Sequence, residues 1–188
     1  ITLIKERDEE NASYLASLAR EEAVKIYGNG VFPRGLVEFT NYCKNNCYYC
    51  GIQGSNQHAN RYRLSKDEIL SACENGYQLG YRSFVLQGGE DPHYSDDVMV
   101  PIVSEIRKRY QDCAITLSLG ERSKESYQKL YDAGADRYLL RHEAATPELY
   151  QKLHSESLSL ENRIQCLWNL KEIGYAVGTG FMVGAPYQ

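Results

Sequence analysis

Three cysteines close together in the chain are the residues best suited to chemistry. Cys43, Cys47 and Cys50 are separated by three and then two residues. Thiolates are the usual ligands of iron–sulfur clusters, and three of them at this spacing can bind three corners of a cubane. Because no fourth cysteine belongs to this group, one iron would stay open to a small molecule. The spacing therefore predicts a cluster that binds a ligand, not one that only carries electrons.

Two other interpretations of these cysteines remain open. Structural zinc takes four ligands, and His58 could be the fourth, although the step from Cys50 is long for such a site. The three thiols could also be inert. The remaining cysteines, Cys73, Cys113 and Cys166, stand apart and are predicted to be core or free thiols. A disulfide framework is typical of shorter secreted chains, so a reducing cytoplasm is the expected compartment.

Further polar residues follow apolar runs that we predict to be strands. Gly88, Gly89 and Glu90 follow one such run. The glycines would let the backbone approach a ligand closely, and the carboxylate would accept an ammonium group. Without its context, this triplet is usually only a turn. Ser118 ends the next run and Glu143 follows the one after it, and a hydroxyl beside a carboxylate suits a ribose diol.

Two arginines and a threonine complete the candidate site. Arg141 can bind a carboxylate or another anion through two N–H groups, or instead pair with Glu143 as a structural ion pair. Thr116 has the same strand parity as Ser118 and is predicted to face the same interior. Arg163 could reach a bound carboxylate or remain a solvated helix charge. Three neighbouring residues are expected to be solvated or structural: Glu121, Arg122 and His142.

The elements that must position these residues alternate along the chain. A helix is predicted from Glu10 to Tyr27 by its apolar spacing. Five apolar runs are predicted strands: Leu36–Thr40, Ser83–Leu86, Ala114–Leu117, Arg137–Leu140 and Tyr175–Val183. Amphipathic helices lie between them, the first starting at a capping box of Ser65 and Glu68. This alternation predicts βαβ units and a parallel sheet.

The place of the polar residues favours one kind of parallel sheet. They follow several strands in turn, as on the rim of a barrel, whereas an open doubly wound sheet gathers its chemistry at one switch point. We therefore predict an α/β fold, a partial TIM-like barrel with about five of the eight strands of a complete barrel. Residues 1–34 are expected to be a helical lead-in, and residues 35–188 the N-terminal part of the barrel without its C-terminal part.

The bulk composition limits the possible partners. The chain has 188 residues, a formal net charge of −4 and a hydrophobic fraction of 43%, which is enough for one core. Lys and Arg are spread along the sequence without a basic block, so we expect no nucleic-acid partner. No apolar run approaches the roughly 18 residues of a membrane span, so no membrane association is expected.

The cysteine motif resembles that of the radical S-adenosylmethionine (SAM) superfamily, with Tyr49 at its aromatic position. The resemblance implies that the open iron chelates the amino and carboxylate groups of SAM. One electron then cleaves the sulfonium, and the 5′-deoxyadenosyl radical attacks the substrate. The segment Gly178–Gly184 resembles the one that passes the adenine. The resemblance implies these cofactor-binding residues: Tyr49, Gly88, Gly89, Glu90, Ser118, Glu143 and Arg163.

Four segments are similar to HydE-type maturases of [FeFe]-hydrogenase, close to biotin synthase and methylornithine synthase: Asn41–Ile52, Tyr62–Ser65, Phe84–Pro92 and Tyr138–Glu143. This likeness implies a SAM-dependent step in assembling the diiron subcluster. The implied substrate is an iron–carbonyl–cyanide species carrying cysteine, in an anion pocket with Thr116 and Arg141 as catalytic residues. A flavodoxin or ferredoxin reductant and other hydrogenase maturases are the implied partners. A methylornithine or biotin synthase-like enzyme, or a truncated non-catalytic metal-binding module, remain alternatives.

Overall fold

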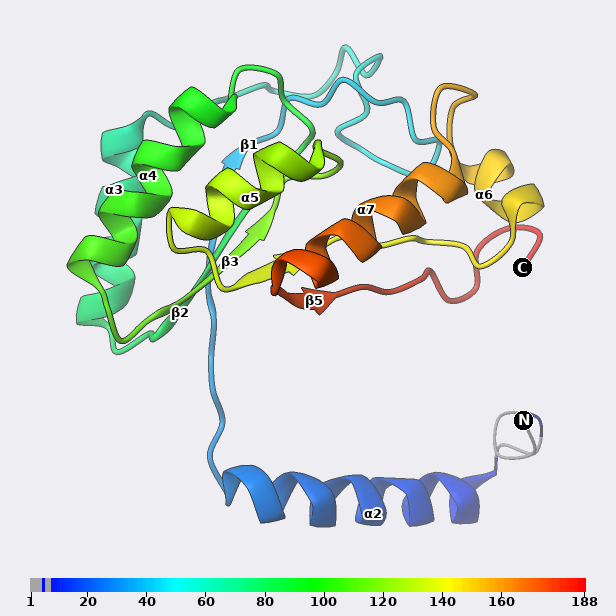
Figure 1. The fold of residues 1–188 in the computed structure, drawn as a ribbon. Helices are drawn as coiled ribbons and strands as arrows, with labels where there is room; N and C mark the ends of the chain where they lie inside the picture. Colours follow the sequence, from blue (N-terminus) through cyan, green and yellow to red (C-terminus); the bar gives the residue numbers. More distant parts are fainter. Residues whose placement is uncertain (1–4, 6–7) are drawn as a thin grey trace. The chain divides into compact units, whose positions relative to one another are not determined.

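The computed structural model describes residue 5 and residues 8–188, and the chain divides into two compact units, Ile1–Pro33 and Arg34–Gln188. In the first unit, helix α2 spans Glu9–Tyr27 (Figure 1). Its N-terminus is capped by Asp8, whose carboxylate accepts a hydrogen bond of 2.7 Å from the backbone of Asn11. Gly28 ends the helix with a positive φ of 61°. The helix predicted in this region is confirmed.

The second unit is built on one sheet of five strands in chain order, and each neighbouring pair is parallel, as predicted. The strands are β1 Gly35–Thr40, β2 Ser83–Gly88, β3 Ala114–Ser118, β4 Arg137–Leu139 and β5 Ala176–Gly178. The predicted fifth strand, Tyr175–Val183, was too long. Regular pairing stops at Gly178, although the segments after β4 and β5 stay side by side. The His142 N–H donates to the Gly180 carbonyl, and Glu143, at a φ of 59°, forms an isolated parallel bridge with Phe181.

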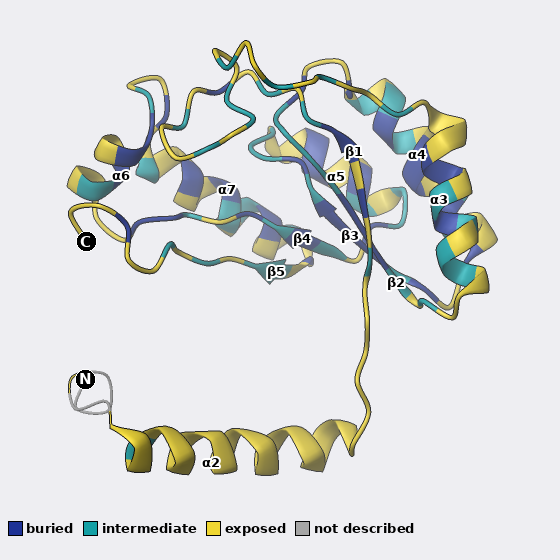
Figure 2. Cartoon of the chain, turned by 180° about the vertical axis from the view of Figure 1, so that it is seen from behind, coloured by how far each residue is buried: buried dark blue, intermediate teal, exposed yellow. Residues whose placement is uncertain are grey.

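Helices follow each of the first four strands: α3 Lys66–Gln78, α4 Asp96–Arg109, α5 Lys124–Asp132, α6 Pro147–Leu153 and α7 Leu160–Ile173. Figures 1 and 2 show α3, α4, α5 and α7 on one face of the sheet, while these helices leave the other face uncovered. A doubly wound sheet would carry helices on both faces. One-sided helices and strands in chain order are the geometry of a TIM-like barrel, so the predicted fold class is confirmed.

The strands alternate between a core face and an inner face. Phe84, Leu86, Ile115, Leu117 and Tyr138 pack against the helices and are almost fully buried. The three isolated cysteines, Cys73, Cys113 and Cys166, lie in the same core and are free thiols, as predicted. Residues of the opposite parity face the inner side of the sheet, where the carboxyl ends of the strands meet the loops.

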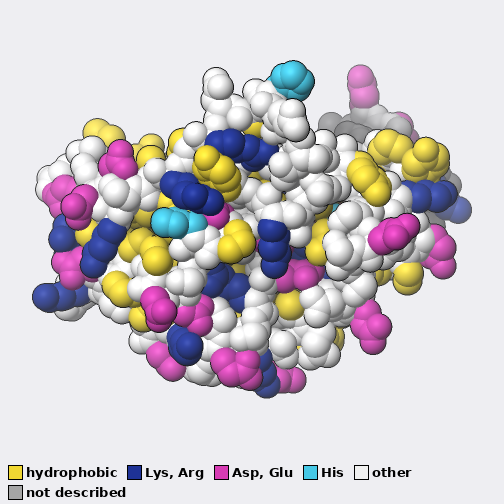
Figure 3. All heavy atoms as spheres, turned by 90° about the horizontal axis from the view of Figure 1, so that it is seen from above, with side chains coloured by type: hydrophobic (Ala, Val, Ile, Leu, Met, Phe, Trp, Pro, Cys, Tyr) yellow, Lys and Arg dark blue, Asp and Glu magenta, His cyan; other side chains and the backbone are white. Residues whose placement is uncertain are grey.

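The polar surface matches the mixed charge of the sequence. Figure 3 shows Lys and Arg interspersed with Asp and Glu on the face that it draws, without a continuous basic area. None of the helices in residue 5 and residues 8–188 has the length and hydrophobicity needed to span a bilayer.

Candidate functional site

One cavity at the carboxyl ends of the strands brings together every predicted catalytic, cofactor-binding and cluster-binding residue except Thr116, while the segment Gly178–Gly184 does not line it. Its volume is about 590 Å³, within the roughly 300–1,000 Å³ of ligand-binding pockets. Thr116 does not line this cavity. It is buried two residues before Ser118 on β3, beside Arg137 of β4, and its hydroxyl has no hydrogen-bond partner in the described structure. A catalytic role for Thr116 stays a prediction.

The three cysteines lie on the loop between β1 and α3, each partly exposed, and none forms a disulfide. Burial raises the pKa of the Cys47 thiol to about 11, and the neighbouring Cys43 and Cys50 contribute to the rise. Binding iron there would have to displace a proton. Their chemistry fits a cubane, because each thiolate would bind a different iron atom.

The zinc alternative has no support from the geometry. His58 is exposed and does not line the cavity. Within the described part of the chain, no three His, Cys, Asp or Glu side chains are grouped around one ion position. A structural zinc would need such a group of ligands around a single centre.

Two arginines hold the cysteine loop in place. The Arg61 guanidinium donates to four backbone carbonyls of this loop, those of Asn41, Ile52, Gln53 and Asn56. Arg63 forms a two-pronged pair with Asp91, at 2.7 and 2.9 Å. Asp91 also accepts a hydrogen bond of 2.8 Å from Thr40 at the end of β1. These contacts fix both ends of the loop to the sheet.

Gly89, just before Glu90, lets the backbone lie close to the cysteine loop. A Cβ added to Gly89 would lie 2.2 Å from the carbonyl oxygen of Tyr42 and 2.8 Å from the Cβ of Cys43. The backbone N–H of Lys44 donates to the Glu90 carbonyl at 3.0 Å. At Gly89, the close approach of the backbone is therefore to the cysteine loop, in addition to any ligand.

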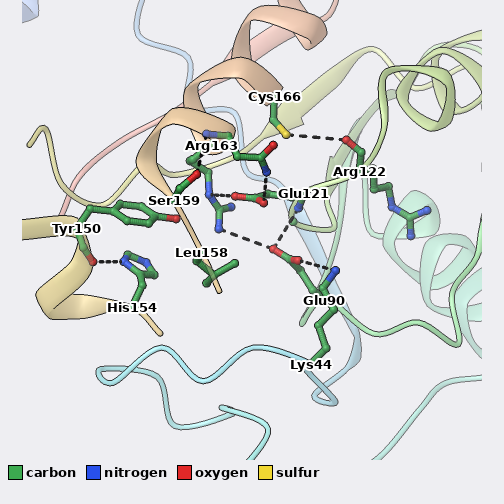
Figure 4. Close-up of polar contacts among 12 residues, drawn as sticks. Lys44, Glu90, Glu121, Arg122, Tyr150, His154, Leu158, Ser159, Arg163 and Cys166 are labelled. Carbon is green, nitrogen blue, oxygen red and sulfur yellow. Dashed lines mark hydrogen bonds and ion pairs between the residues drawn. The ribbon is translucent and has the colours of Figure 1, made fainter. Parts of the chain in front are cut away.

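Arg163 lies at the centre of a buried charge network (Figure 4). Its Nε is 2.8 Å from Glu121 Oε1, and its Nη2 is 3.7 Å from Glu90 Oε1. Lys44 Nζ lies 3.5 Å from the other Glu90 oxygen. The Arg163–Glu121 contact is an ion pair without hydrogen-bond alignment, because Nε and Oε1 both lack a hydrogen-bond partner.

The contacts of these charged residues correct three expectations. The Arg163 side chain is only 9% exposed, so the solvated alternative for it is wrong. Glu121 was expected to be a solvated loop charge, but it is largely buried against Arg163, and burial raises the pKa of its carboxyl group. Arg122 is not solvated either, since it pairs with Asp96 of α4 at 3.1 Å. Glu121 and Arg163 meet because the loop after β3 lies against the first turn of α7. No local sequence pattern indicates this contact.

Gly120, at the start of the loop after β3, makes room for Glu90. Its φ is +75°, and an added Cβ would lie 2.0 Å from Glu90 Cγ. Its carbonyl accepts hydrogen bonds from the hydroxyls of Tyr127 at 3.3 Å and Tyr138 at 2.9 Å. Two core tyrosines therefore hold the peptide against which Glu90 lies.

Arg141 and Glu143 form the ion pair that was one alternative for them, at 3.1 Å. The Arg141 side chain is 61% exposed at the cavity, whereas that of Glu143 is 7% exposed. Glu143 Oε2 is buried without a hydrogen-bond partner in the described structure. This orphaned oxygen in a cavity wall fits a ligand hydroxyl or amine, since a buried acceptor left unpaired costs roughly 1–3 kcal/mol.

The Tyr49 side chain is hydrogen-bonded to His154, a residue that the sequence analysis did not single out. The Tyr49 hydroxyl lies 3.1 Å from His154 Nε2, and His154 Nδ1 lies 2.9 Å from the carbonyl of Tyr150. Nδ1 must donate to that carbonyl, so Nε2 accepts from Tyr49. The imidazole stacks on the Tyr150 ring at 3.9 Å, and burial lowers its pKa. Residues 49 and 154 are far apart in the sequence, so no local sequence pattern could predict that they are in contact.

Comparisons with known proteins show which family the chain resembles. The family model of the Radical SAM superfamily matches residues 37–188. The chain is 48% identical over 93% of its length to the "[FeFe] hydrogenase maturase subunit HydE" of Thermotoga maritima. It is 32% identical over 97% of its length to a 3-methylornithine synthase of Methanosarcina barkeri. The crystal structure of methylornithine synthase (PylB) superposes with a TM-score of 0.89 at 30% identity, over 100% of this chain and 55% of that one.

The matches cover only part of each relative. The chain spans 49% of the Thermotoga protein and 52% of the Methanosarcina protein, about half the length of the curated relatives. The matched part contains the whole cavity described above, including the cysteine loop.

Proposed function

Because the chain belongs to the radical SAM superfamily, we propose that it cleaves SAM at a [4Fe–4S] cluster on Cys43, Cys47 and Cys50, in assembly of the diiron subcluster of [FeFe]-hydrogenase. The observation that carries this proposal is the single cavity shared by the three thiols and the acidic and basic rim residues. The 48% identity to HydE supports the maturation role over the methylornithine synthase role, at 32%.

In this proposal, different residues bind different groups of SAM. The bound cluster would supply the electron that cleaves the sulfonium of SAM. Gly88, Gly89 and Glu90 would present acceptors to the SAM ammonium group. The orphaned oxygen of Glu143, with the Ser118 hydroxyl, would bind the ribose hydroxyls.

Arg163 and Arg141 take different roles in this proposal. Arg163 is held by two carboxylates, so it would orient Glu90 and offer its remaining N–H groups to the SAM carboxylate. Arg141, exposed in the cavity, would bind an anionic part of the substrate. The cavity walls would exclude water from the reacting atoms.

A second candidate, methylornithine synthesis, is supported by the TM-score of 0.89 with PylB. The two relatives differ in their reactions, one being a hydrogenase maturase subunit and the other a 3-methylornithine synthase. Incubation of the reduced protein with SAM and L-lysine separates the candidates. Formation of 3-methylornithine, detected by mass spectrometry, would replace the maturation role with this one.

EPR of the anaerobically reconstituted and reduced protein, with and without SAM, tests the proposal first. We expect a reduced [4Fe–4S] signal that changes when SAM is added, because SAM would bind the open iron. A cluster signal that ignores SAM would reject the SAM site, and zinc in place of iron would reject the cluster. The cytoplasm as location and a flavodoxin or ferredoxin as reductant belong to the same proposal.

A further inference from the structure

Glu38 and Gln87 form a polar pair on the inner face of β1 and β2, and the roles proposed for the cluster and SAM use neither residue. The strand register places Glu38 beside Gln87, and Gln87 beside Ser118 of β3. All three line the cavity. Gln87 Nε2 donates a hydrogen bond of 3.0 Å to Glu38 Oε1. One row across three strands therefore presents oxygen atoms to the cavity.

Glu38 differs from the other carboxylates of the cavity in having no cation beside it. Glu90 pairs with Lys44 and Arg163, and Glu143 pairs with Arg141. Among the ion pairs of residue 5 and residues 8–188, none involves Glu38. A carboxylate in a cavity wall that lacks a cation is a favourable place for a positively charged donor.

Gln87 orients the Glu38 carboxylate and supplies a further hydrogen-bond acceptor beside it. Since one amide N–H is used on Glu38, the amide oxygen of Gln87 remains an acceptor. The strand position of Glu38 is itself fixed, because the Tyr62 hydroxyl donates to the Glu38 carbonyl at 2.9 Å. The pair therefore offers acceptors of fixed position, as a group that selects a ligand requires.

We propose that Glu38, oriented by Gln87, binds a protonated amine of the substrate and selects for it. This inference rests on the proposed function, in which Arg141 binds the anionic part of the same molecule. Glu38 on β1 and Arg141 after β4 line one cavity with opposite charges. The substrate class is a small molecule that carries both a protonated amine and an anionic group, such as an amino acid or its derivative.

The test uses two probes that differ only in the amine. S-methyl-L-cysteine has an amine and a carboxylate, while 3-(methylthio)propionate has the carboxylate alone. Their affinities are measured by saturation-transfer NMR on the reconstituted, oxidised protein, with and without SAM. We expect the wild type to bind the amine-bearing probe about tenfold more tightly, the effect of one hydrogen bond to a charged group.

Glu38→Gln keeps the shape and removes the charge, so it should bring the affinity ratio of the two probes close to one. Gln87→Leu should lower the same ratio with Glu38 intact. The matched control is Glu156→Gln, at an exposed residue outside the cavity, which should leave the ratio unchanged. Equal affinities in the wild type, or an unchanged ratio in a folded Glu38→Gln protein, would overturn the inference.

SAM binding is measured on the same samples, so that the two proposals fail separately. A cluster signal that ignores SAM in the wild type rejects the proposed function, whatever the probes do. If Glu38→Gln lowers the affinity for SAM and not that for the amine-bearing probe, Glu38 belongs to the SAM site and the inference is wrong. If Glu38→Gln does not fold, Gln87→Leu decides the outcome.

Discussion

At the scale of single residues, Cys47 is the cysteine of the loop that packs against a buried cluster. It packs against the small cluster of buried residues that includes Tyr150, Leu153 and Leu158. We expect Cys47→Ala to abolish cluster assembly, because only two thiolates would remain on the loop. Iron content and visible absorbance after reconstitution measure the effect. Cys113→Ala, in the core, should keep its iron, and a brown Cys47→Ala protein would contradict the ligand assignment.

His154 is expected to act on the site through the Tyr49 hydroxyl. His154→Phe keeps an aromatic ring against Tyr150 but removes the acceptor, so the Tyr49 ring loses its fixed position. The affinity for SAM should fall by about fivefold, the effect of one neutral hydrogen bond. The affinity is measured by the SAM-dependent change in the EPR signal.

A double-mutant cycle with Tyr49→Phe separates this role from simple packing. If His154 works through Tyr49, His154→Phe should have no further effect on SAM affinity in the Tyr49→Phe protein. Full additivity of the two losses would show that His154 only supports α6. His154→Gln, which keeps an acceptor, should recover part of the affinity.

Arg163 is expected to contribute strongly to stability. Arg163→Met leaves Glu121 buried without its cation and Glu90 with Lys44 alone, and breaking a buried pair in this way costs about 3–5 kcal/mol. Urea denaturation of the cluster-free protein measures the free energy of unfolding. Lys124→Met is the control, because the Lys124–Glu172 pair is about half exposed and should contribute less than about 1 kcal/mol. Similar losses for both variants would contradict the buried network.

At the scale of elements, the cysteine loop depends on the Arg63–Asp91 pair. Burial alone would raise the pKa of Asp91, but the hydrogen bonds from Arg63, the His93 backbone and Thr40 lower it below its ordinary value of 3.8. The stabilising contribution of Asp91 is therefore present above pH 3.8 and is lost as the pH falls through the lowered pKa. Asp91→Asn should lower the protection of the loop amides against hydrogen exchange at neutral pH. It should also remove the dependence of this protection on acid.

Hydrogen exchange of loop amides in the cluster-free protein measures this effect. In the wild type, protection should fall on acidification through this range, after correction for the intrinsic exchange rate. In Asp91→Asn, protection should be low at every pH. A loop that keeps wild-type protection in the variant would mean that Arg61 holds it alone.

The elements were predictable where their signals are local. The capping box of Ser65 and Glu68 forms as predicted, with a backbone bond of 2.7 Å from Ser65 to the Glu68 carboxylate. Both ends of α7 also carry local signals, because Ser159 caps its start and Gly174 ends it with a positive φ. The length of β5 was not predictable from its own apolar residues, since it depends on its pairing with β4, which becomes irregular beyond Leu139.

The site residues were predictable where strand parity and the order of the strands determine their position. They were not predictable where elements distant in the sequence come into contact. Ser118 and the cysteine loop share one cavity because parallel strands end on the same side. Glu38 alternates with the apolar residues Val37 and Phe39, so its inner position was available from the sequence and was missed. The burial of Glu121 and the contact of His154 with Tyr49 depend on how α6 and α7 approach the loops, which carries no local signal.

At the scale of the whole molecule, ligand binding should stabilise the fold that carries the cavity. SAM that binds only the folded protein adds about 2.7 kcal/mol at 100 times its dissociation constant. For a protein of this size, that gain corresponds to a rise in Tm of about 5–11 °C. Thermal unfolding of the reconstituted protein with and without SAM measures it. An unchanged Tm at saturating SAM would contradict a site inside the folded cavity.

The space that Gly120 leaves for Glu90 has a consequence for how such proteins can diverge. An added Cβ at position 120 would overlap Glu90, and the positive φ there disfavours any side chain. A change at one of these positions should therefore be followed by a change at the other. Among relatives, a residue larger than glycine at position 120 should accompany a shorter side chain at position 90. The pair would mark a branch that binds its ligand amine in another way, and deep mutational scanning of both positions together would reveal the epistasis.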